Sequence, residues 1–361
     1  MTHKERLLTA LNHEEPDRVP ICAWYTPEAE RRMLHHLGVA SEETETYQAA
    51  GGPLPILMDH DFLISWVGPC TGYYARPDRE YTDEWGIGWK WFEHPSGGSF
   101  TEMVRRPLAD IRDPAEFSMP DFSREDRYWG ARKLLDEYGD EYGIMGGCAC
   151  TLFELAWYLR GMERVLMDLA VNKDFAHAYL DKLMAWIQTA GRKFAQMKVD
   201  IIWIGDDFGA QNRMLVSPAV FREFFKPRYA QLFAEWKAIH PGVKIAFHSD
   251  GYVYPILSDL VEIGLDILNP VQPKSMDPAR VKRDFGDRLT LWGTVDIQEV
   301  LPYGSPEDVA AEVRLRVRTA GRGGGLILAP AHNIQADVPI ENILAFYHSA
   351  KEHGQYPIAE G

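Results

Sequence analysis

The residues best suited to chemistry include two that close a short apolar run, VKIAFHSDG, which extends from Val243 to Gly251. His248 and Asp250 stand two positions apart in this run, and side chains two apart on a strand point to the same face. Imidazole nitrogen and carboxylate oxygen bind zinc and other divalent metals, and both groups also carry protons in acid–base catalysis. The glycine that follows allows a tight turn away from such a site.

Polar residues end most of the other apolar runs as well. They are Cys148, Cys150, Asp206, Asp207, Asn269, Gln272, Asp296 and His332. Aspartate or asparagine after a strand is often only the N-cap of the next helix, so each of these residues has a structural explanation when taken alone. Capping rarely uses histidine, which favours a site for His248 and His332. A buried histidine bonded to a carbonyl group is the alternative for each.

The composition describes an ordinary globular protein. The chain has 361 residues, of which 46% are hydrophobic and 25% are charged, enough for one large domain or two smaller ones. A formal net charge of -15 argues against nucleic acid or an anionic membrane as a partner, because both require a basic face. Four scattered cysteines, an amphipathic N-terminal helix and the lack of a long apolar stretch predict a cytoplasmic protein.

The first part of the chain is irregular. We expect helices over residues 3–13 and 27–37, strands at 19–25 and around 55–68, and a hairpin over 73–94. From residue 142 onward, six short apolar runs each precede a segment of helical period. These runs are 142–150, 200–207, 243–251, 265–273, 289–296 and 325–332.

This alternation predicts a parallel sheet with crossover helices. No GxGxxG or Walker loop follows any run, which disfavours an open nucleotide-binding sheet. Six units and the two earlier strands make eight. We therefore expect an α/β fold, a (β/α)8 TIM barrel, with residues 1–361 as a single domain that carries an N-terminal extension and a hairpin insertion. In that fold the active site lies at the C-terminal ends of the strands, where the polar residues above would meet.

Several motifs resemble the uroporphyrinogen decarboxylase (URO-D) superfamily, which also contains cobalamin-dependent methyltransferases. The stretch from Leu291 to Phe346 is similar to the C-terminal third of that family, and HSDG stands where the methyltransferases carry HxCG. CACTLFELAWYLRG and LVSPAVFREFFKPRY resemble two further family segments. Together these matches cover roughly residues 140 to 350. The family folds as a (β/α)8 barrel, so the resemblance implies the architecture that the alternation of elements already predicts.

One departure separates this chain from the true decarboxylases. They carry an arginine-rich RQAGRY segment after the first strand to hold the carboxylates of the substrate, whereas this sequence reads CAWYTPEAERR there. An acidic chain without that segment would leave the charges of a porphyrinogen unpaired. The sequence is therefore closer to the methyltransferase branch, although His332 does fall where the decarboxylases have a histidine.

The resemblance implies a metal site. The methyltransferases hold zinc with the histidine and cysteine of HxC and with a second cysteine at the position of His332. The corresponding set here is His248, Asp250 and His332, three ligands with one open position, for Zn2+ or another divalent transition metal such as manganese, iron or cobalt. Asp206 or Asp207 would supply a fourth ligand or orient a histidine.

The function implied is a methyltransferase that acts with a corrinoid carried by a separate protein. The metal would activate a small methylated substrate, a methyl ether or amine, and the methyl group would pass to the cobalt of the corrinoid. The candidate substrate-binding residues are Asp206, Gln272, Glu154 and Asp296. Glu154 also has an alternative explanation as an acid in the first turn of a helix. The aromatic residues Tyr25, Trp66, Tyr73, Tyr74 and Trp85 would either cover substrate and partner or pack in the core.

Two other functions stay open. In a metal-independent decarboxylase of a small carboxylate substrate, His332 with Asp207 or Tyr25 would protonate a carbanion. A non-catalytic small-molecule binding protein on the same barrel is the third reading, because a fold alone does not determine function. The identity of the methyl donor, the metal and the oligomeric state are also open.

Overall fold

A parallel sheet forms the centre of the protein, whose computed structural model describes residues 1–39, 52–68, 80–93 and 99–359. The sheet has seven strands in the order β1-β5-β6-β7-β8-β9-β10, so spatial order follows chain order. The strands are β1 (Phe62–Val67), β5 (Gly143–Ala149), β6 (Ile201–Gly205), β7 (Lys244–His248), β8 (Ile267–Asn269), β9 (Thr290–Val295) and β10 (Leu326–Pro330). Each neighbouring pair is parallel. The six predicted β-then-α units are confirmed.

Residues 19–25, the closing segment, lie before β1 in the chain and close the sheet into a barrel. Ile21 and Tyr25 form parallel bridges with Leu328 and Ile334, at and just beyond β10. On its other side, the backbone N–H of Asp61 donates to the Ile21 carbonyl over 2.9 Å. The predicted first strand therefore occupies the eighth position of the barrel, between β10 and β1.

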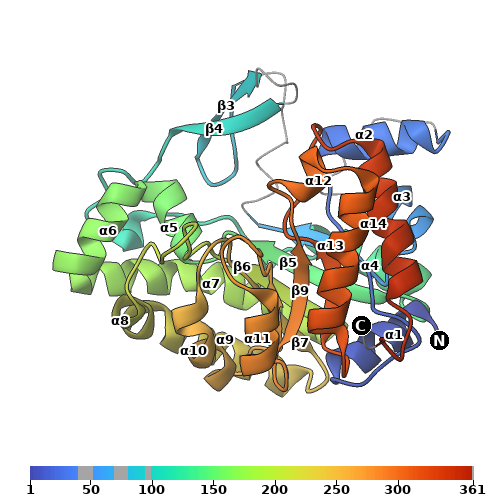
Figure 1. The fold of residues 1–361 in the computed structure, drawn as a ribbon. Coiled ribbons are helices and arrows are strands. Elements are labelled where there is room, and N and C mark those ends of the chain that lie inside the picture. The colour runs from blue at the N-terminus through green and yellow to red at the C-terminus, as the bar shows by residue number, and fades with distance from the viewer. Residues whose placement is uncertain (40–51, 69–79, 94–98, 360–361) are drawn as a thin grey trace.

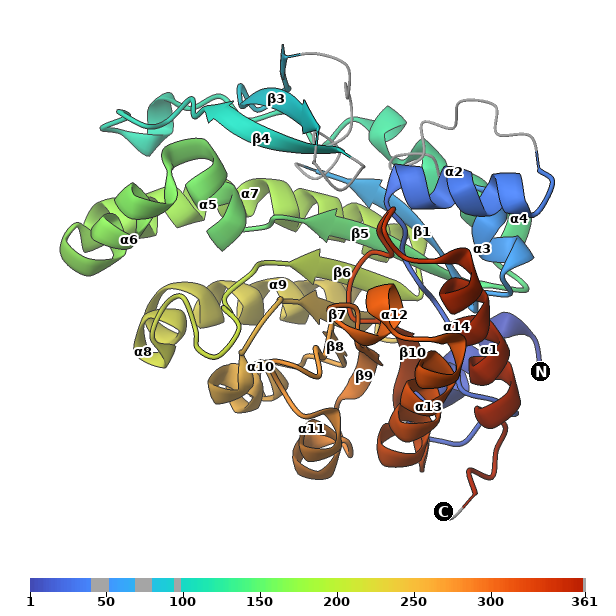
Figure 2. The same ribbon diagram turned by 45° about the horizontal axis from the view of Figure 1, so that its top comes forward.

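Helices cover the outside of the strands (Figures 1 and 2). The α-helices are α1 (His3–Leu11), α2 (Pro27–His36), α3 (Pro53–Leu57), α4 (Trp129–Tyr138), α5 (Phe153–Arg160), α6 (Met162–Val171), α7 (Lys173–Met197), α8 (Pro218–Val220), α9 (Lys226–Ile239), α10 (Leu257–Glu262), α11 (Pro278–Phe285), α12 (Val300–Tyr303), α13 (Pro306–Arg316) and α14 (Ile340–His353). Short 3-10 turns lie at Pro114–Glu116, Glu125–Tyr128 and Tyr254–Ile256, and π-helical turns lie at Phe221–Phe225 and Val317–Gly321. Among the described residues, no helix has both the length and the apolar character that crossing a membrane requires.

Two expectations for the first part of the chain need correction or completion. The region 55–68 is not one strand, because its first residues belong to the short helix α3 and only Phe62–Val67 forms β1. The predicted hairpin is part of a three-stranded antiparallel sheet, β2 (Tyr81–Thr82), β3 (Gly88–Glu93) and β4 (Ser99–Arg105), that projects from the barrel (Figure 1). Residues 73–79 of that prediction lie outside the described residues.

The inside of the barrel is filled by inward-facing side chains from successive strands. Phe62, Met145, Ile201, Trp203 and Trp292 belong to one cluster of buried residues. Two leucines of α1, Leu7 and Leu11, belong to the same cluster, so α1 closes the N-terminal end of the barrel. The polar strand ends therefore face the opposite end, as expected for this fold.

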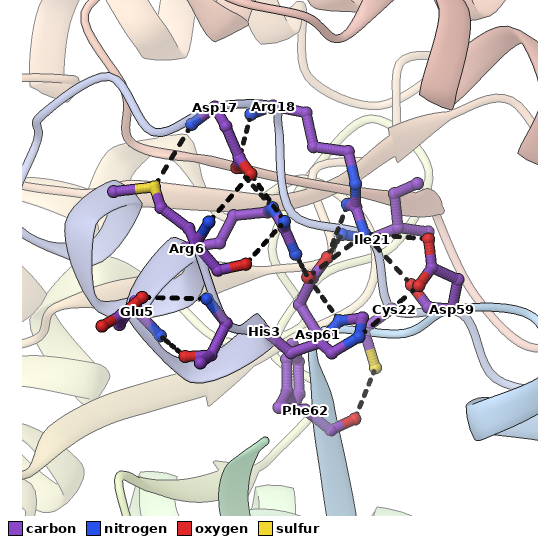
Figure 3. Close-up of polar contacts among 12 residues, drawn as sticks. His3, Glu5, Arg6, Asp17, Arg18, Ile21, Cys22, Asp59, Asp61 and Phe62 are labelled. Atoms are coloured by element: carbon purple, nitrogen blue, oxygen red, sulfur yellow. Dashed lines mark hydrogen bonds and ion pairs between the residues drawn. The ribbon is translucent and has the colours of Figure 1, made fainter. Parts of the chain in front are cut away.

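The buried carboxylate of Asp61 joins the elements that meet where the barrel closes (Figure 3). The side chain of Asp61 is fully buried; it accepts hydrogen bonds from Arg6 over 2.7 Å, Arg18 over 2.8 Å and the Ile21 backbone N–H over 2.7 Å. Burial alone would raise the pKa of Asp61, but the hydrogen bond with His3 and the arginine charges hold it below its ordinary value. One carboxylate thus joins α1, the closing segment and β1.

We predict that Asp61→Asn lowers the free energy of unfolding by about 3 kcal/mol, because the arginines lose a buried counter-charge. Urea denaturation measures this change. Because the pKa of Asp61 is lower in the folded state, its stabilisation is complete above about pH 4 and is lost as the pH falls through the folded pKa. The matched control is Asp59→Asn, at a side chain that is 37% exposed, which we expect to cost less than about 1 kcal/mol. Equal losses in the two variants would contradict the assigned role.

Candidate metal centre

Three predicted ligands converge at the C-terminal end of the barrel. His248 is the last residue of β7, Asp250 follows two positions later, and His332 lies just beyond β10. One nitrogen or oxygen atom from each lies within 4.8 Å of the other two. Nε2 of His248 is 3.7 Å from Oδ1 of Asp250, and Nε2 of His332 is 3.6 Å from Oδ2 of Asp250. These two separations are close to the roughly 3.4 Å expected between two ligands that are each 2.0–2.2 Å from one tetrahedral zinc ion.

Asn269 at the end of β8 fixes which nitrogen of His248 faces this site. The indole N–H of Trp203 can only donate, and it donates to Oδ1 of Asn269 over 3.2 Å. The carbonyl of Trp292 can only accept, and it accepts from Nδ2 of Asn269 over 3.2 Å. The amide orientation is therefore unambiguous, and Nδ1 of His248, 2.7 Å from Oδ1, must donate its proton. In the neutral imidazole this leaves the lone pair of Nε2 pointing at the site.

The surroundings of that lone pair fit a cation. Oδ1 of Asp250 is buried and has no hydrogen-bond partner among the described residues. Oδ1 of Asp207 is 3.8 Å from the same Nε2 atom. A lone pair that faces two carboxylates is repelled by them unless a proton or a metal ion stands between. Nitrogen and carboxylate oxygen suit zinc and the other divalent transition metals, so the residues present fit such an ion.

Asp207 lies beside the three candidate ligands and supports one of them. Its Oδ1 atom accepts the backbone N–H of Asp250 over 2.8 Å, which fixes the turn after β7. Burial raises the pKa of Asp207, and the nearby Asp250 carboxylate raises it further. Asp207 can therefore act as a further ligand when ionised or hold a proton when neutral.

Asp206, directly after β6, and Glu154, in the first turn of α5, lie behind the site. The carboxylate of Asp206 is fully buried and accepts the backbone N–H groups of Leu152 and Glu154 over 2.7 and 2.8 Å, together with the hydroxyls of Thr151 and Tyr229. This geometry favours a positioning role for Asp206 over contact with substrate. Burial, followed by the charges of Asp207 and Asp206, raises the pKa of Glu154 well above its ordinary value. This shift favours the protonated form of Glu154.

The other predicted site residues take different places. Gln272 accepts the Gly251 backbone N–H over 2.6 Å and so supports the loop that carries Asp250. Asp296, at the end of β9, accepts the backbone N–H of Gln298 over 2.8 Å, and no described contact joins it to the three candidate ligands. The hydroxyl of Tyr25 is bonded over 2.7 Å to that of Tyr347, and Tyr25 borders a separate cavity.

The aromatic residues divide between core and cavity. Trp85 is 2% exposed and packs against Trp186 and Phe122, so it belongs to the core. Trp66 is partly buried and lines the cavity that Tyr25 borders. Tyr73 and Tyr74 lie outside the described residues.

Sequence reasoning assigned no role to two residues that shape the site. Asn269 was visible as a polar strand end, but its orienting role depends on Trp203 and Trp292 from neighbouring strands. Trp24, whose ring centroid is 6.0 Å from that of His248, gave no signal beyond a place in the first predicted strand.

Comparison with known proteins places this geometry in context. A family model described as uroporphyrinogen decarboxylase (URO-D) matches residues 93–353. The methylcobamide:CoM methyltransferase MtaA of Methanosarcina barkeri is 26% identical over 98% of this chain and 98% of its own length. The methylated-thiol–coenzyme M methyltransferase of Methanosarcina mazei is 24% identical over 98% of this chain and 90% of its own length. A uroporphyrinogen decarboxylase of Crocosphaera subtropica is 23% identical over 62% of each chain.

A solved structure shares the whole fold. The structure described as a methyltransferase from Methanosarcina mazei has a TM-score of 0.72 and 21% sequence identity, over 98% of this chain and 99% of that chain. The match confirms the fold. The similarity to methyltransferases extends over nearly the whole chain, whereas that to the decarboxylase is shorter, which confirms the resemblance to the methyltransferase branch.

We predict that Asn269→Leu lowers zinc affinity by about 10- to 100-fold, because His248 loses the acceptor that fixes its tautomer. Competition with a chromogenic chelator measures the affinity. Asn342→Leu is the matched control, since this buried amide donates over 2.8 Å to the carbonyls of Leu301 and Gly304, away from the site. The control is expected to lose stability but to keep its zinc affinity. Unchanged affinity in Asn269→Leu would refute the orienting role.

Proposed function

This chain belongs to the uroporphyrinogen decarboxylase family, and from that premise we propose that it is a metal-dependent methyltransferase that acts with a corrinoid protein. The observation that carries the proposal is the convergence of His248, Asp250 and His332 around a buried, unpartnered carboxylate oxygen. The similarity to methyltransferases over nearly the full length supports it. Both groups of relatives are named as enzymes, which disfavours a non-catalytic binding protein.

In this proposal the three residues hold Zn2+ or another divalent transition metal. The bound ion would supply Lewis-acid polarisation of a methylated oxygen or nitrogen atom. Asn269 keeps Nε2 of His248 aimed at the site, and Asp207 holds the backbone of Asp250 in place. Glu154, neutral through burial, supplies a proton near the group that loses its methyl.

The proposed substrate is a small methylated molecule, an ether or an amine, and the methyl acceptor is the cobalt of a corrinoid bound to a separate protein. We assign substrate contact at the C-terminal end of the barrel to Glu154, Gln272 and Asp296. Glu154 lies in the first turn of α5, Gln272 follows β8, and Asp296 follows β9. Asp206 supports this surface through α5. Tyr25 instead borders the separate cavity beside the site.

We also propose that residues 1–361 form a single domain and that the protein is cytoplasmic. The N-terminal segment supplies the eighth barrel position, so it cannot be detached without opening the barrel. The sequence has four scattered cysteines, too few for a disulfide framework, which suits a reducing compartment.

A metal-independent decarboxylase of a small carboxylate is the second candidate. One observation favours it: Asp207 lies 3.8 Å from Nε2 of His248, and the upward shift of its pKa, caused by burial and the Asp250 carboxylate, favours its protonated form. With His332, this residue would protonate the carbanion left by loss of carbon dioxide.

We predict that protein purified without added metal or chelator contains about one equivalent of a divalent transition metal, measured by elemental analysis. His248→Ala and His332→Ala are each expected to lose it, because only two ligands remain. His348→Ala, at a side chain that is 81% exposed, is the control and should retain the metal. A metal-free wild type that stays metal-free after zinc is supplied would contradict the ligand assignment.

Methyl transfer itself can be measured. With free cob(I)alamin as the acceptor, the metal-loaded protein should accelerate demethylation of a methyl ether or methylated amine, followed through the absorbance of cob(I)alamin. We expect His248→Ala to reduce the rate by about 100-fold or more. Release of carbon dioxide from small carboxylic acids in the presence of chelator, with no reaction of the methyl donors, would favour the decarboxylase instead.

A further inference from the structure

A small cavity lies beside the candidate metal centre. Its volume is about 100 Å3, and α2, α3, β1 and the closing segment contribute to its wall. Aromatic and polar side chains line it, namely Trp24, Tyr25, Glu30, His60, Trp66 and Asn333. We call this cavity the Glu30 pocket. Figure 2 shows α2 and α3, which carry or adjoin part of this wall, close to β1.

The Glu30 pocket shares a wall with the metal centre. The indole of Trp24 lines the pocket, and its ring centroid is 6.0 Å from that of His248. Asn333, another lining residue, directly follows His332. A group bound in the pocket would therefore be separated from the candidate ligands by little more than one indole ring.

The pocket contains one acidic side chain; the charge of the neighbouring Arg31 acts on it, but no described ion pair neutralises it. Glu30 lies in the first turn of α2, and no described lysine or arginine forms an ion pair with it. The neighbouring Arg32 donates to the carbonyls of Ala336 and Val338 instead. A Cβ atom at Gly52 would lie 3.0 Å from Oε1 of Glu30, so the glycine leaves room for this carboxyl group. Burial raises the pKa of Glu30 to about 7.

The other titratable groups of the pocket do not supply a positive charge. Nε2 of His60 is 2.7 Å from the hydroxyl of Tyr347, which is 2.7 Å from that of Tyr25. Burial lowers the pKa of His60 to about 4, so this imidazole is neutral at pH 7. Burial raises the pKa of Tyr25, so its phenol is neutral as well. The ionised pocket thus carries the single negative charge of Glu30.

Aromatic faces next to an acidic group form a binding site for an organic cation. Trp24 and Trp66 meet nearly perpendicularly, at 75° and with ring centroids 5.5 Å apart, so they form two walls of a corner. Tryptophan is the strongest partner in cation–π attraction, and the attraction increases when water is excluded. A cavity this small suits a compact group better than a whole drug-sized molecule.

We propose that the Glu30 pocket binds a small alkylated ammonium group of the substrate, with Glu30 as its counter-ion and Trp24 and Trp66 as its aromatic walls. The rest of the substrate extends past Trp24 toward His248. This inference rests on the proposed function for the identity of the reacting end, but binding of the ammonium group is independent of metal and of methyl transfer.

Isothermal titration at pH 8, with and without chelator, tests the proposal. The probes are choline and its neutral isostere 3,3-dimethylbutan-1-ol, and we expect choline to bind at least about tenfold more tightly. Glu30→Gln should remove this preference, and Trp66→Leu should weaken choline binding more than binding of the alcohol. The matched control is Glu307→Gln, which removes an equal charge from an exposed position on α13 and should bind choline as wild type does. Circular dichroism verifies that each variant is folded.

Three results would overturn the proposal: equal affinity for the two probes, an unchanged preference in folded Glu30→Gln, or loss of choline binding in His248→Ala alone. The last would place the cation at the metal centre. Choline binding that persists in His248→Ala, in protein without metal or methyl-transfer activity, would support the pocket while rejecting the proposed function.

Discussion

Closure of the barrel depends on one buried carboxylate in addition to the backbone hydrogen bonds along β10. Parallel strands that follow one another in the chain produce a barrel only if the last strand meets the first. Here the closing segment exchanges backbone hydrogen bonds with β10 and the residues after it. On its β1 side, the Asp61 carboxylate binds the Ile21 backbone together with the guanidinium groups of Arg6 and Arg18. Because the closing segment lies against β10, this attachment also places Trp24 and Tyr25 beside the loop that carries His332. The site at one end of the barrel thus depends on an ion cluster at the other.

Packing inside the barrel also decides the chemistry of His248. The indoles of Trp203 and Trp292 fill the barrel. The side-chain amide of Asn269, on β8, accepts from the indole N–H of Trp203 and donates to the backbone carbonyl of Trp292. That amide then orients the imidazole. A core substitution that moved either tryptophan would reach the metal centre through the tautomer of His248, without any contact with the ion.

The sequence predicted the architecture because each β-then-α unit is a local pattern. It also predicted that His248, Asp250 and His332 meet, because strand ends in a barrel share one rim. It could not separate α3 from β1, since PLPIL and FLISWV are both short apolar runs and only tertiary contacts decide between helix and strand. The Glu30 pocket could not be predicted from the sequence for another reason: its residues come from separate segments that share no periodic pattern.

The distribution of charge favours a methyltransferase over a decarboxylase. Asp207 and Asp250 lie together at the C-terminal end of the barrel, and Glu30 lines the adjoining pocket. Lys274, next to Asp296, is already paired with Glu299. A substrate with several carboxylates would meet repulsion there, with no described basic cluster to offset it. In the proposed function, a divalent cation between the histidines and Asp250 would change this balance, because it would neutralise the carboxylates nearest to His248 and leave a site of low net charge. A neutral ether or amine could then enter such a site, and a cationic end of the same molecule would find its counter-charge at Glu30.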